Sequence, residues 1–236
     1  MLQPLDEIAA RLGALRLQGR EVVWHCDAAQ AVGKIPLDLR KQPIDLLSIS
    51  AHKIYGPKGQ GALFVRRRRP PLRLLPQIEG GGQERGLRSG TLNVAGIVGF
   101  GEACRLSHSE GAADAIRLGI MRDQLQSRLQ QALGKGVIIN GNQEHRLPNA
   151  LNVSFPGVHG AELLTSLRDV ALSSGSACSS GAGTPSHVLT ALGRDVTLAA
   201  ASLRFGLGRT TTATEVERAA ERVIAEIRSC GKRYRP

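Results

Sequence analysis

The chain has 236 residues, of which 42% are hydrophobic and 22% are charged, a composition typical of one or two folded domains and too apolar for intrinsic disorder. Aromatic residues make up only 3% of the chain, which excludes an extended stacking platform for single-stranded nucleic acid. The 31 Lys and Arg against 20 Asp and Glu give a net charge of +11, and this excess favours anionic partners or substrates.

The cysteines indicate a reducing compartment. Cys26, Cys104, Cys178 and Cys230 are far apart and form no CxxC pair, so the spacing predicts neither a zinc site nor a disulfide framework. Cys26 and Cys104 stand in apolar segments and are expected in the core. No basic-then-apolar signal sequence opens the chain, and its longest uncharged stretch, 170–193, is rich in Ser, Gly and Thr. We therefore expect a cytoplasmic protein without a membrane span or a metal site.

The first half of the chain begins with a helix and continues with closely spaced strands. Apolar residues at helical spacing predict a helix over Leu5–Leu17. Short apolar runs predict strands over Glu21–His25, Ile44–Ser50 and Gly61–Val65. The glycine-rich stretch Gln77–Thr91 is expected to be a loop. Together these elements indicate an α/β sheet that has few elements before its third strand.

The second half of the sequence predicts a smaller α+β domain. Two helices are expected over Leu92–Leu106 and Ile116–Leu133, because apolar residues recur at helical spacing in both. The remaining predicted elements are the strands Val137–Asn140, Ala150–Phe155 and Ser202–Leu207 and the helices Gly160–Arg168, His187–Leu192 and Thr214–Ser229. We expect a domain boundary near residue 108, with a truncated α/β domain at 1–108 and an α+β domain at 109–236.

The segment with the most candidate catalytic side chains follows the second predicted strand. This strand leads directly into His52-Lys53, which puts a primary amine at the carboxyl end of a strand, where open α/β sheets bind ligands. Asp27 ends the preceding apolar run. A lysine and a carboxylate are the pair that pyridoxal phosphate (PLP) needs, one for an imine and one for the pyridine nitrogen, and Ser50 and His52 could then donate to the phosphate. The alternative is a surface lysine with Asp27 as a turn residue.

A second candidate is Cys178, which lies within the glycine- and serine-rich stretch 173–181. A cysteine among small residues is accessible, and near positive charge its thiolate would be a nucleophile. The alternative is a small buried apolar residue, which is the usual place of a free cysteine. The residues alone leave both interpretations open.

Six motifs together resemble the cysteine desulfurases of the NifS/IscS type, within the class-V aminotransferases. They are HCDAAQ (25–30), SISAHKIYGPKGQGALFVRR (48–67), GGGQERGLRSGT (80–91), LPNALNVSF (147–155), SSGSACSS (173–180) and SLRFGLGR (202–209). The resemblance extends from about residue 5 to the last helix, and its order and spacing match throughout. It implies a PLP-dependent type I fold, here with an incomplete large-domain parallel or mixed sheet and a small α+β C-terminal domain.

The resemblance implies a set of cofactor contacts. Lys53 would bond to the aldehyde of PLP, Asp27 would pair with the pyridine nitrogen, and Gln30 would contact the phenolic oxygen. Ser50 and His52 would bind the phosphate.

It also implies how the substrate is handled. Thr91 would reach the phosphate in the other subunit of a homodimer, and Arg204 would bind the carboxylate of L-cysteine, for which its planar fork is suited. Cys178 would be the nucleophile that takes the sulfur as a persulfide while alanine is released. An iron–sulfur scaffold protein or a sulfur-relay protein, in tRNA thiolation for example, would then accept the sulfur.

Chains of this family begin well before the position of Met1, with residues that complete the cofactor site. We therefore expect the purified chain to be a weak or inactive enzyme. Selenocysteine lyase is an alternative activity, and a non-catalytic fragment that keeps a dimer or partner surface is the alternative outside enzymes.

Arg66–Arg69 forms a run of four arginines after the third strand. Such runs can contact the phosphates of nucleic acid, but a solvated edge is the commoner reason for a charge run. We expect the solvated edge and no direct binding of nucleic acid.

Overall fold

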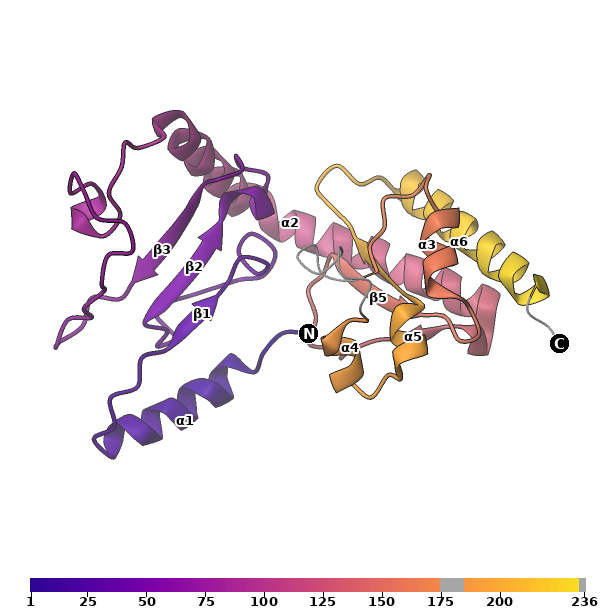
Figure 1. Cartoon of the computed structure of the whole chain (residues 1–236), viewed down its shortest axis with the longest axis horizontal. Coiled ribbons are helices and arrows are strands. Elements are labelled where there is room, and N and C mark those ends of the chain that lie inside the picture. The colour runs from indigo at the N-terminus through magenta and orange to yellow at the C-terminus, as the bar shows by residue number, and fades with distance from the viewer. Residues whose placement is uncertain (175–184, 234–236) are drawn as a thin grey trace. The chain divides into compact units, whose positions relative to one another are not determined.

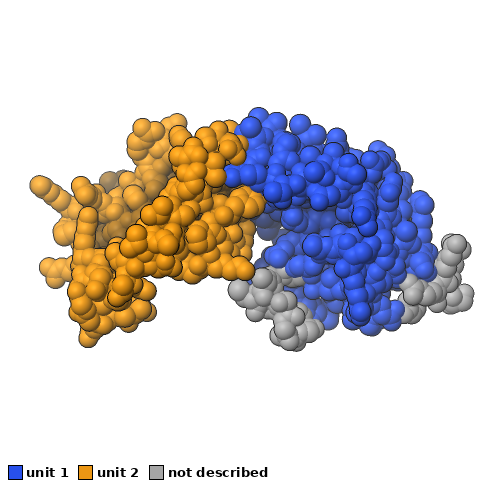
Figure 2. Space-filling view, turned by 90° about the horizontal axis from the view of Figure 1, so that it is seen from above, with its two compact units in different colours: residues 1–2, 113–236 blue, residues 3–112 orange. Residues whose placement is uncertain are grey.

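The computed structural model describes residues 1–174 and 185–233, with only the backbone of 231–233. The chain forms two compact units, shown in separate colours in Figure 2: the N-terminal unit, residues 3–112, and the C-terminal unit, residues 1–2 and 113–236. The division falls inside helix α2 (Val94–Leu133), and the boundary expected near residue 108 lies in the same helix. Among the described residues, no helix has both the length and the apolar character needed to cross a membrane.

The N-terminal unit contains a three-stranded mixed sheet (Figure 1) in the order β1-β2-β3. β1 (His25–Asp27) is parallel to β2 (Leu46–Ser50), and β2 is antiparallel to β3 (Gly61–Val65). Helix α1 (Leu5–Leu17) precedes the sheet and covers the predicted range. There are also two short 3-10 helices. The first, η1 (Ala51–Ile54), follows β2 directly, and the second, η2 (Glu84–Gly86), interrupts the glycine-rich loop.

The first strand lies later in the chain than the predicted Glu21–His25. Side chains bond the backbone before it: the Arg16 guanidinium donates to the carbonyl of Val22 at 2.9 Å, and the Trp24 N–H donates to the Asp45 carboxylate at 2.8 Å. Ladder pairing with β2 therefore starts only at His25.

Two apolar clusters hold the N-terminal unit together. One surrounds Trp24, Ile44 and Leu47, and α1 packs against it. The other joins Ala51 and Ile54 of η1 to Phe100 and Ala103 of α2. Apolar side chains at these spacings bury one side of each element, and this burial drives its docking.

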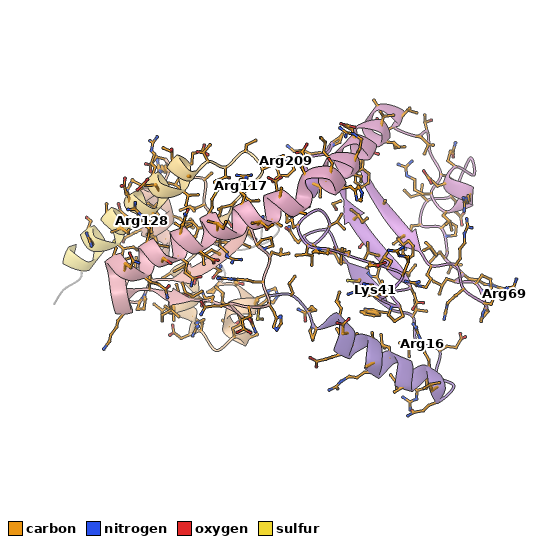
Figure 3. The ribbon with its side chains drawn as sticks, turned by 180° about the vertical axis from the view of Figure 1, so that it is seen from behind. Arg16, Lys41, Arg69, Arg117, Arg128 and Arg209 are labelled. Carbon is orange, nitrogen blue, oxygen red and sulfur yellow. The ribbon has the colours of Figure 1, made fainter. Side chains whose placement is uncertain are left out.

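The arginine run is not the solvated edge that was expected. Arg66 is half-buried and donates to the carbonyls of Ile44 and Gln42, each at 2.7 Å. Arg68 lies 4.0 Å from the buried Asp45 carboxylate. Only the alternate members, Arg67 and Arg69, are exposed, because successive residues of an extended segment point to opposite sides. Figure 3 labels Arg69.

Helix α2 is a single helix of 40 residues, so the prediction of two helices is wrong. The apolar spacing lapses between Leu106 and Ile116, but this stretch contains no proline, and helical hydrogen bonds need no apolar face. Cys104 is exposed rather than in the core. Its neighbour Ala103 is buried, and one residue turns a helix by about 100°.

The C-terminal unit contains an antiparallel sheet in the order β4-β5-β6. Its elements are β4 (Ile138–Ile139), β5 (Ala150–Ser154), α3 (Gly160–Ser166), α4 (His187–Ala191), α5 (Val196–Ala200), β6 (Ser202–Gly206) and α6 (Ala213–Arg233), with η3 (Gly134–Gly136) after α2. The predicted strands are all present. Helix α5 was not predicted, although Asp195 caps it by accepting from the Leu198 N–H at 2.8 Å.

One large apolar cluster forms the core of the C-terminal unit, and it includes Val153 of β5, Leu203 of β6 and Val223 of α6. Polar contacts fix the turn after β6. Arg117 of α2 donates to the carbonyls of Arg209 and Thr211 at 2.7 and 2.8 Å (Figure 3). The sheet and the start of α6 are therefore both tied to the second half of α2.

Candidate active site

The polar residues predicted from the strand ends lie at one edge of the N-terminal sheet. β1 and β2 are parallel, and Asp27 at the end of β1 pairs in register with Ser48. Ser50 is the last residue of β2, and η1 follows it directly with His52 and Lys53. The carboxyl ends of parallel strands form the edge at which open α/β sheets bind ligands.

The sequence of η1 explains how Lys53 is presented. Ala51 and Ile54 are buried in the contact with α2, so the two residues between them are turned outward. His52 is exposed and Lys53 is half-buried. Tyr55 ends the turn with a φ of 67°, in the left-handed region. Lys53 thus stands on a short turn that two buried side chains anchor.

Asp27 is exposed and starts a turn. Its Oδ1 accepts a hydrogen bond from the Ala29 N–H at 2.9 Å, an arrangement that aspartate favours at the start of turns. Gln30 lies exposed in the same turn. On the sheet beside it, the His25 Nε2 and the Ser48 hydroxyl are 3.1 Å apart.

Lys34 is a polar neighbour of this edge that the sequence did not indicate. It is half-buried, and its Nζ donates to the backbone carbonyl of Gln30 at 3.1 Å and to its Oε1 at 3.4 Å. Burial lowers the pKa of Lys34, and the positive charge of Lys53 lowers it further. The two lysines are near each other, because a Cβ at Gly33, the residue before Lys34, would lie 3.0 Å from Cγ2 of Ile54, the residue after Lys53. The i, i+4 spacing of Gln30 and Lys34 is the feature of the sequence that could have indicated their contact.

Thr91 is exposed at the end of the glycine-rich loop. Side chains of the loop fold it on itself: Gln83 Oε1 accepts from the Gly90 N–H at 2.9 Å, and the Ser89 hydroxyl accepts from the Gly82 N–H at 3.3 Å. These bonds fix the backbone immediately before Thr91.

Arg204 belongs to the C-terminal unit, on β6, and its side chain is exposed. Ser173 bonds to it twice: the Arg204 N–H donates to the Ser173 carbonyl at 2.6 Å, and Nη2 donates to the Ser173 hydroxyl at 3.2 Å. Cys178 lies outside the described residues. The sequence did not indicate the contact with Ser173, because it joins residues 31 positions apart.

The residues at the sheet edge suit the chemistry of PLP. They offer an amine, a carboxylate and a carboxamide in Lys53, Asp27 and Gln30, while Ser50 and His52 add a hydroxyl and an imidazole. An aldehyde, a ring nitrogen, a phenolic oxygen and a phosphate need donors and acceptors of these kinds. In the described part of the chain, no three His, Cys, Asp or Glu side chains gather in a way that could hold a metal ion.

The family follows from a comparison with known sequences. The model of the aminotransferase class-V family matches residues 1–219. The chain belongs to this family. Class-V aminotransferases depend on PLP, and the relatives found in the comparison confirm the resemblance to the NifS/IscS type.

The chain is similar to curated cysteine desulfurases. It is 49% identical to the cysteine desulfurase IscS of Anaeromyxobacter sp. strain Fw109-5 over 228 residues, which are 97% of this chain and 55% of the relative. It is 51% identical to the mitochondrial cysteine desulfurase of Saccharomyces cerevisiae, over 92% of this chain and 42% of the relative. The chain thus spans about half the length of these relatives.

Solved structures confirm the fold. A NifS-like protein matches with a TM-score of 0.81 and 35% identity, over 96% of this chain and 57% of that protein. The NifS-like protein of Rickettsia africae matches with a TM-score of 0.79 and 31% identity, over 94% of this chain and 57% of that protein. The two sheets described above are thus part of a type I PLP-dependent fold.

Proposed function

We propose that this chain acts in PLP-dependent cysteine desulfuration, taking sulfur from L-cysteine and leaving L-alanine. The observation that carries the proposal is the gathering of Asp27, Ser50 and Lys53 at the carboxyl edge of one sheet, with Gln30 in the adjoining turn. The similarity to cysteine desulfurases over nearly the whole chain supports it.

In this proposal the N-terminal unit holds the cofactor. The Lys53 Nζ would bond to its aldehyde carbon, the Asp27 carboxylate would accept a hydrogen bond from the protonated pyridine nitrogen, and Gln30 would contact the phenolic oxygen. Ser50 and His52 would donate to the phosphate. PLP, when bound, supplies an electron sink that allows bonds at the α and β carbons of an amino acid to break.

The C-terminal unit handles substrate and sulfur. The Arg204 guanidinium binds the substrate carboxylate in a bidentate fashion. The Cys178 thiolate takes the sulfur: the bond between the substrate's β carbon and sulfur breaks, and a sulfur–sulfur bond forms on Cys178. The electron pair of the broken bond stays on the carbon, which takes a proton and becomes the methyl group of alanine. No outside oxidant or reductant is needed.

Two further features complete the proposal. Two copies of the chain associate, and Thr91 of one copy binds the phosphate held by the other. The persulfide on Cys178 then passes its outer sulfur to an iron–sulfur scaffold or sulfur-relay protein in the cytoplasm.

Trapping the cofactor tests the site directly. The purified chain is incubated with PLP and reduced with borohydride, and the modified lysine is identified by mass spectrometry. We expect the label at Lys53, its loss in Lys53→Ala, and its retention in Lys58→Ala, because Lys58 is an exposed lysine five positions away. Labels scattered over many lysines would contradict the proposed site.

A second assay tests the reaction. The chain is given L-cysteine and a thiol reductant, and alanine and sulfide are measured together. We expect the two in equal and small amounts, in line with the weak activity expected of this chain, and neither from Cys178→Ser. Turnover of selenocysteine alone would instead identify a selenocysteine lyase.

A further inference from the structure

The turn that follows β1, residues 28–35, contains a lysine to which the proposed function gives no task. We propose that Lys34 is a positioning residue that fixes the Gln30 side-chain amide with its NH2 group directed outward, as a donor to an anionic oxygen of the ligand. This inference rests on the proposed function, because it concerns how Gln30 meets the cofactor.

The hydrogen-bonding chemistry of the two side chains determines the orientation. The Lys34 ammonium can only donate, and it lies 3.1 Å from the Gln30 carbonyl and 3.4 Å from Gln30 Oε1. A carboxamide has one accepting end and one donating end. Because Lys34 occupies the accepting end, the Nε2 end is left to donate. Without Lys34, the amide can rotate by 180° and present an acceptor instead.

The backbone holds Lys34 in place for this contact. The turn is tied to the sheet by the Ala28 N–H, which donates to the Ser48 carbonyl at 3.0 Å. At Gly33, φ is +73°, and a Cβ there would lie 2.9 Å from Ser107 Oγ and 3.0 Å from Ile54 Cγ2. The turn is therefore packed closely between α2 and η1, and η1 is the element that contains Lys53.

The charge of Lys34 agrees with this placement. Its ammonium is half-buried, and its pKa is lowered by that burial and by the nearby charge of Lys53. A buried ammonium needs acceptors to remain charged, and Gln30 supplies two. The same contact thus stabilises the Lys34 charge and orients the Gln30 amide.

The first test is carried out without cofactor. NMR of the 15N-labelled chain follows the Nε2 protons of Gln30 in wild type, Lys34→Met and Lys34→Arg, with Lys41→Met, an exposed lysine, as the control. We expect Lys34→Met to shift these resonances and increase the side-chain mobility, while Lys34→Arg, which keeps a donor, restores the wild-type signature. Unchanged Gln30 resonances in Lys34→Met would overturn the proposal. If Lys34→Met does not fold, the Lys34→Arg variant decides. A Gln30 side-chain amide that is as mobile in Lys34→Arg as in the denatured chain would overturn the proposal equally.

The second test is a double-mutant cycle on the affinity for PLP. We expect Lys34→Met and Gln30→Ala each to weaken binding about tenfold, the size of one charge-assisted hydrogen bond, and the double variant to be no weaker than Gln30→Ala. A full additional loss in the double variant would show that Lys34 attracts the cofactor directly, and would overturn the inference. If wild type traps no PLP at Lys53, the proposed function fails, whereas the NMR comparison still decides on Lys34.

Discussion

Asp45 connects three parts of the N-terminal unit through one carboxylate. It is 1% exposed, pairs with Arg16 of α1, lies 4.0 Å from Arg68, and accepts from the Trp24 N–H at 2.8 Å. Figure 3 shows Arg16 on α1, the helix that this pair ties to the sheet. A buried carboxylate that lost these partners would strongly destabilise the folded unit.

Replacing Asp45 should therefore destabilise this unit. We expect Asp45→Asn to lower its free energy of unfolding by about 3 kcal/mol, because Arg16 and Arg68 lose their counter-charge while they are partly buried. Urea unfolding followed by the fluorescence of Trp24, the single tryptophan of the chain, measures the loss.

Asp38→Asn is the control. Asp38 pairs with Arg40, whose side chain is 91% exposed, and solvent screens such pairs so that they contribute little to stability. Equal losses in the two variants would contradict the role given to Asp45.

The neighbouring lysines allow a prediction about charge. Burial is the larger cause of the lowered pKa of Lys34, and the charge of Lys53 is the second. Lys53→Gln removes only the second cause, so the pKa of Lys34 should rise and still remain below that of a free lysine. The pH dependence of Lys34 acetylation, read by mass spectrometry, measures it, with Lys58→Gln as the control. A pKa that fell or did not move would contradict the proximity of the two lysines.

Sequence reasoning at the residue scale succeeded where one element defines a position. Asp27, Ser50 and Lys53 could be assigned to one edge because each ends or follows a strand that the sequence predicts. Ser173 could not be identified, because its contact with Arg204 depends on tertiary structure. Whether Cys178 and the other site residues act as proposed stays a prediction.

Among the elements, α2 shows how packing overrides intrinsic preference. Its first half contains several glycines, although glycine in a helix costs about 1 kcal/mol relative to alanine. A Cβ at Gly99 would lie 2.8 Å from Cγ of Pro57, and one at Gly111 would lie 3.2 Å from the Gly33 carbonyl oxygen. These glycines let the helix approach the loop after η1 and the turn after β1.

Two glycines of α2 that are two positions apart should respond in opposite directions. Gly101→Ala should stabilise the chain by up to about 1 kcal/mol, because a Cβ there meets nothing within 4 Å. Gly99→Ala should destabilise it, because the Pro57 ring cannot move aside as a flexible side chain can. Thermal unfolding of both variants measures the difference. Stabilisation by Gly99→Ala would show that this close approach is absent.

The elements themselves were largely predictable, but not their ends. Apolar spacing located α1, β3 and the amphipathic α6. It failed at β1, where the side chains of Arg16 and Asp45 bond the backbone that a strand would have used. It also failed between Leu106 and Ile116, where α2 continues without an apolar face.

The two units differ in the size of their cores. Among the described residues, the cluster of the C-terminal unit contains 18 buried residues, while the two clusters of the N-terminal unit contain four each. Since buried apolar area is the main source of stability, the C-terminal unit should be the more stable.

Hydrogen exchange measures this difference strand by strand. We expect the amides of Val153 and Leu203, in paired strands of the C-terminal sheet, to open at a higher free energy than the amides of Cys26 and Asp27 in β1. Equal protection in both sheets would mean that the whole chain unfolds as one cooperative body.

The division of the chain into units also sets an order of events during synthesis. Residues 3–112 form one unit, so the ribosome completes all of its elements before it begins the rest of the other unit. The C-terminal sheet needs β6 to pair with β5, and α6 to cover its core. At about 5–20 residues per second, these arrive on the order of ten seconds later. The smaller core thus has the first opportunity to fold, and the larger core forms only after β6 and α6 have been made.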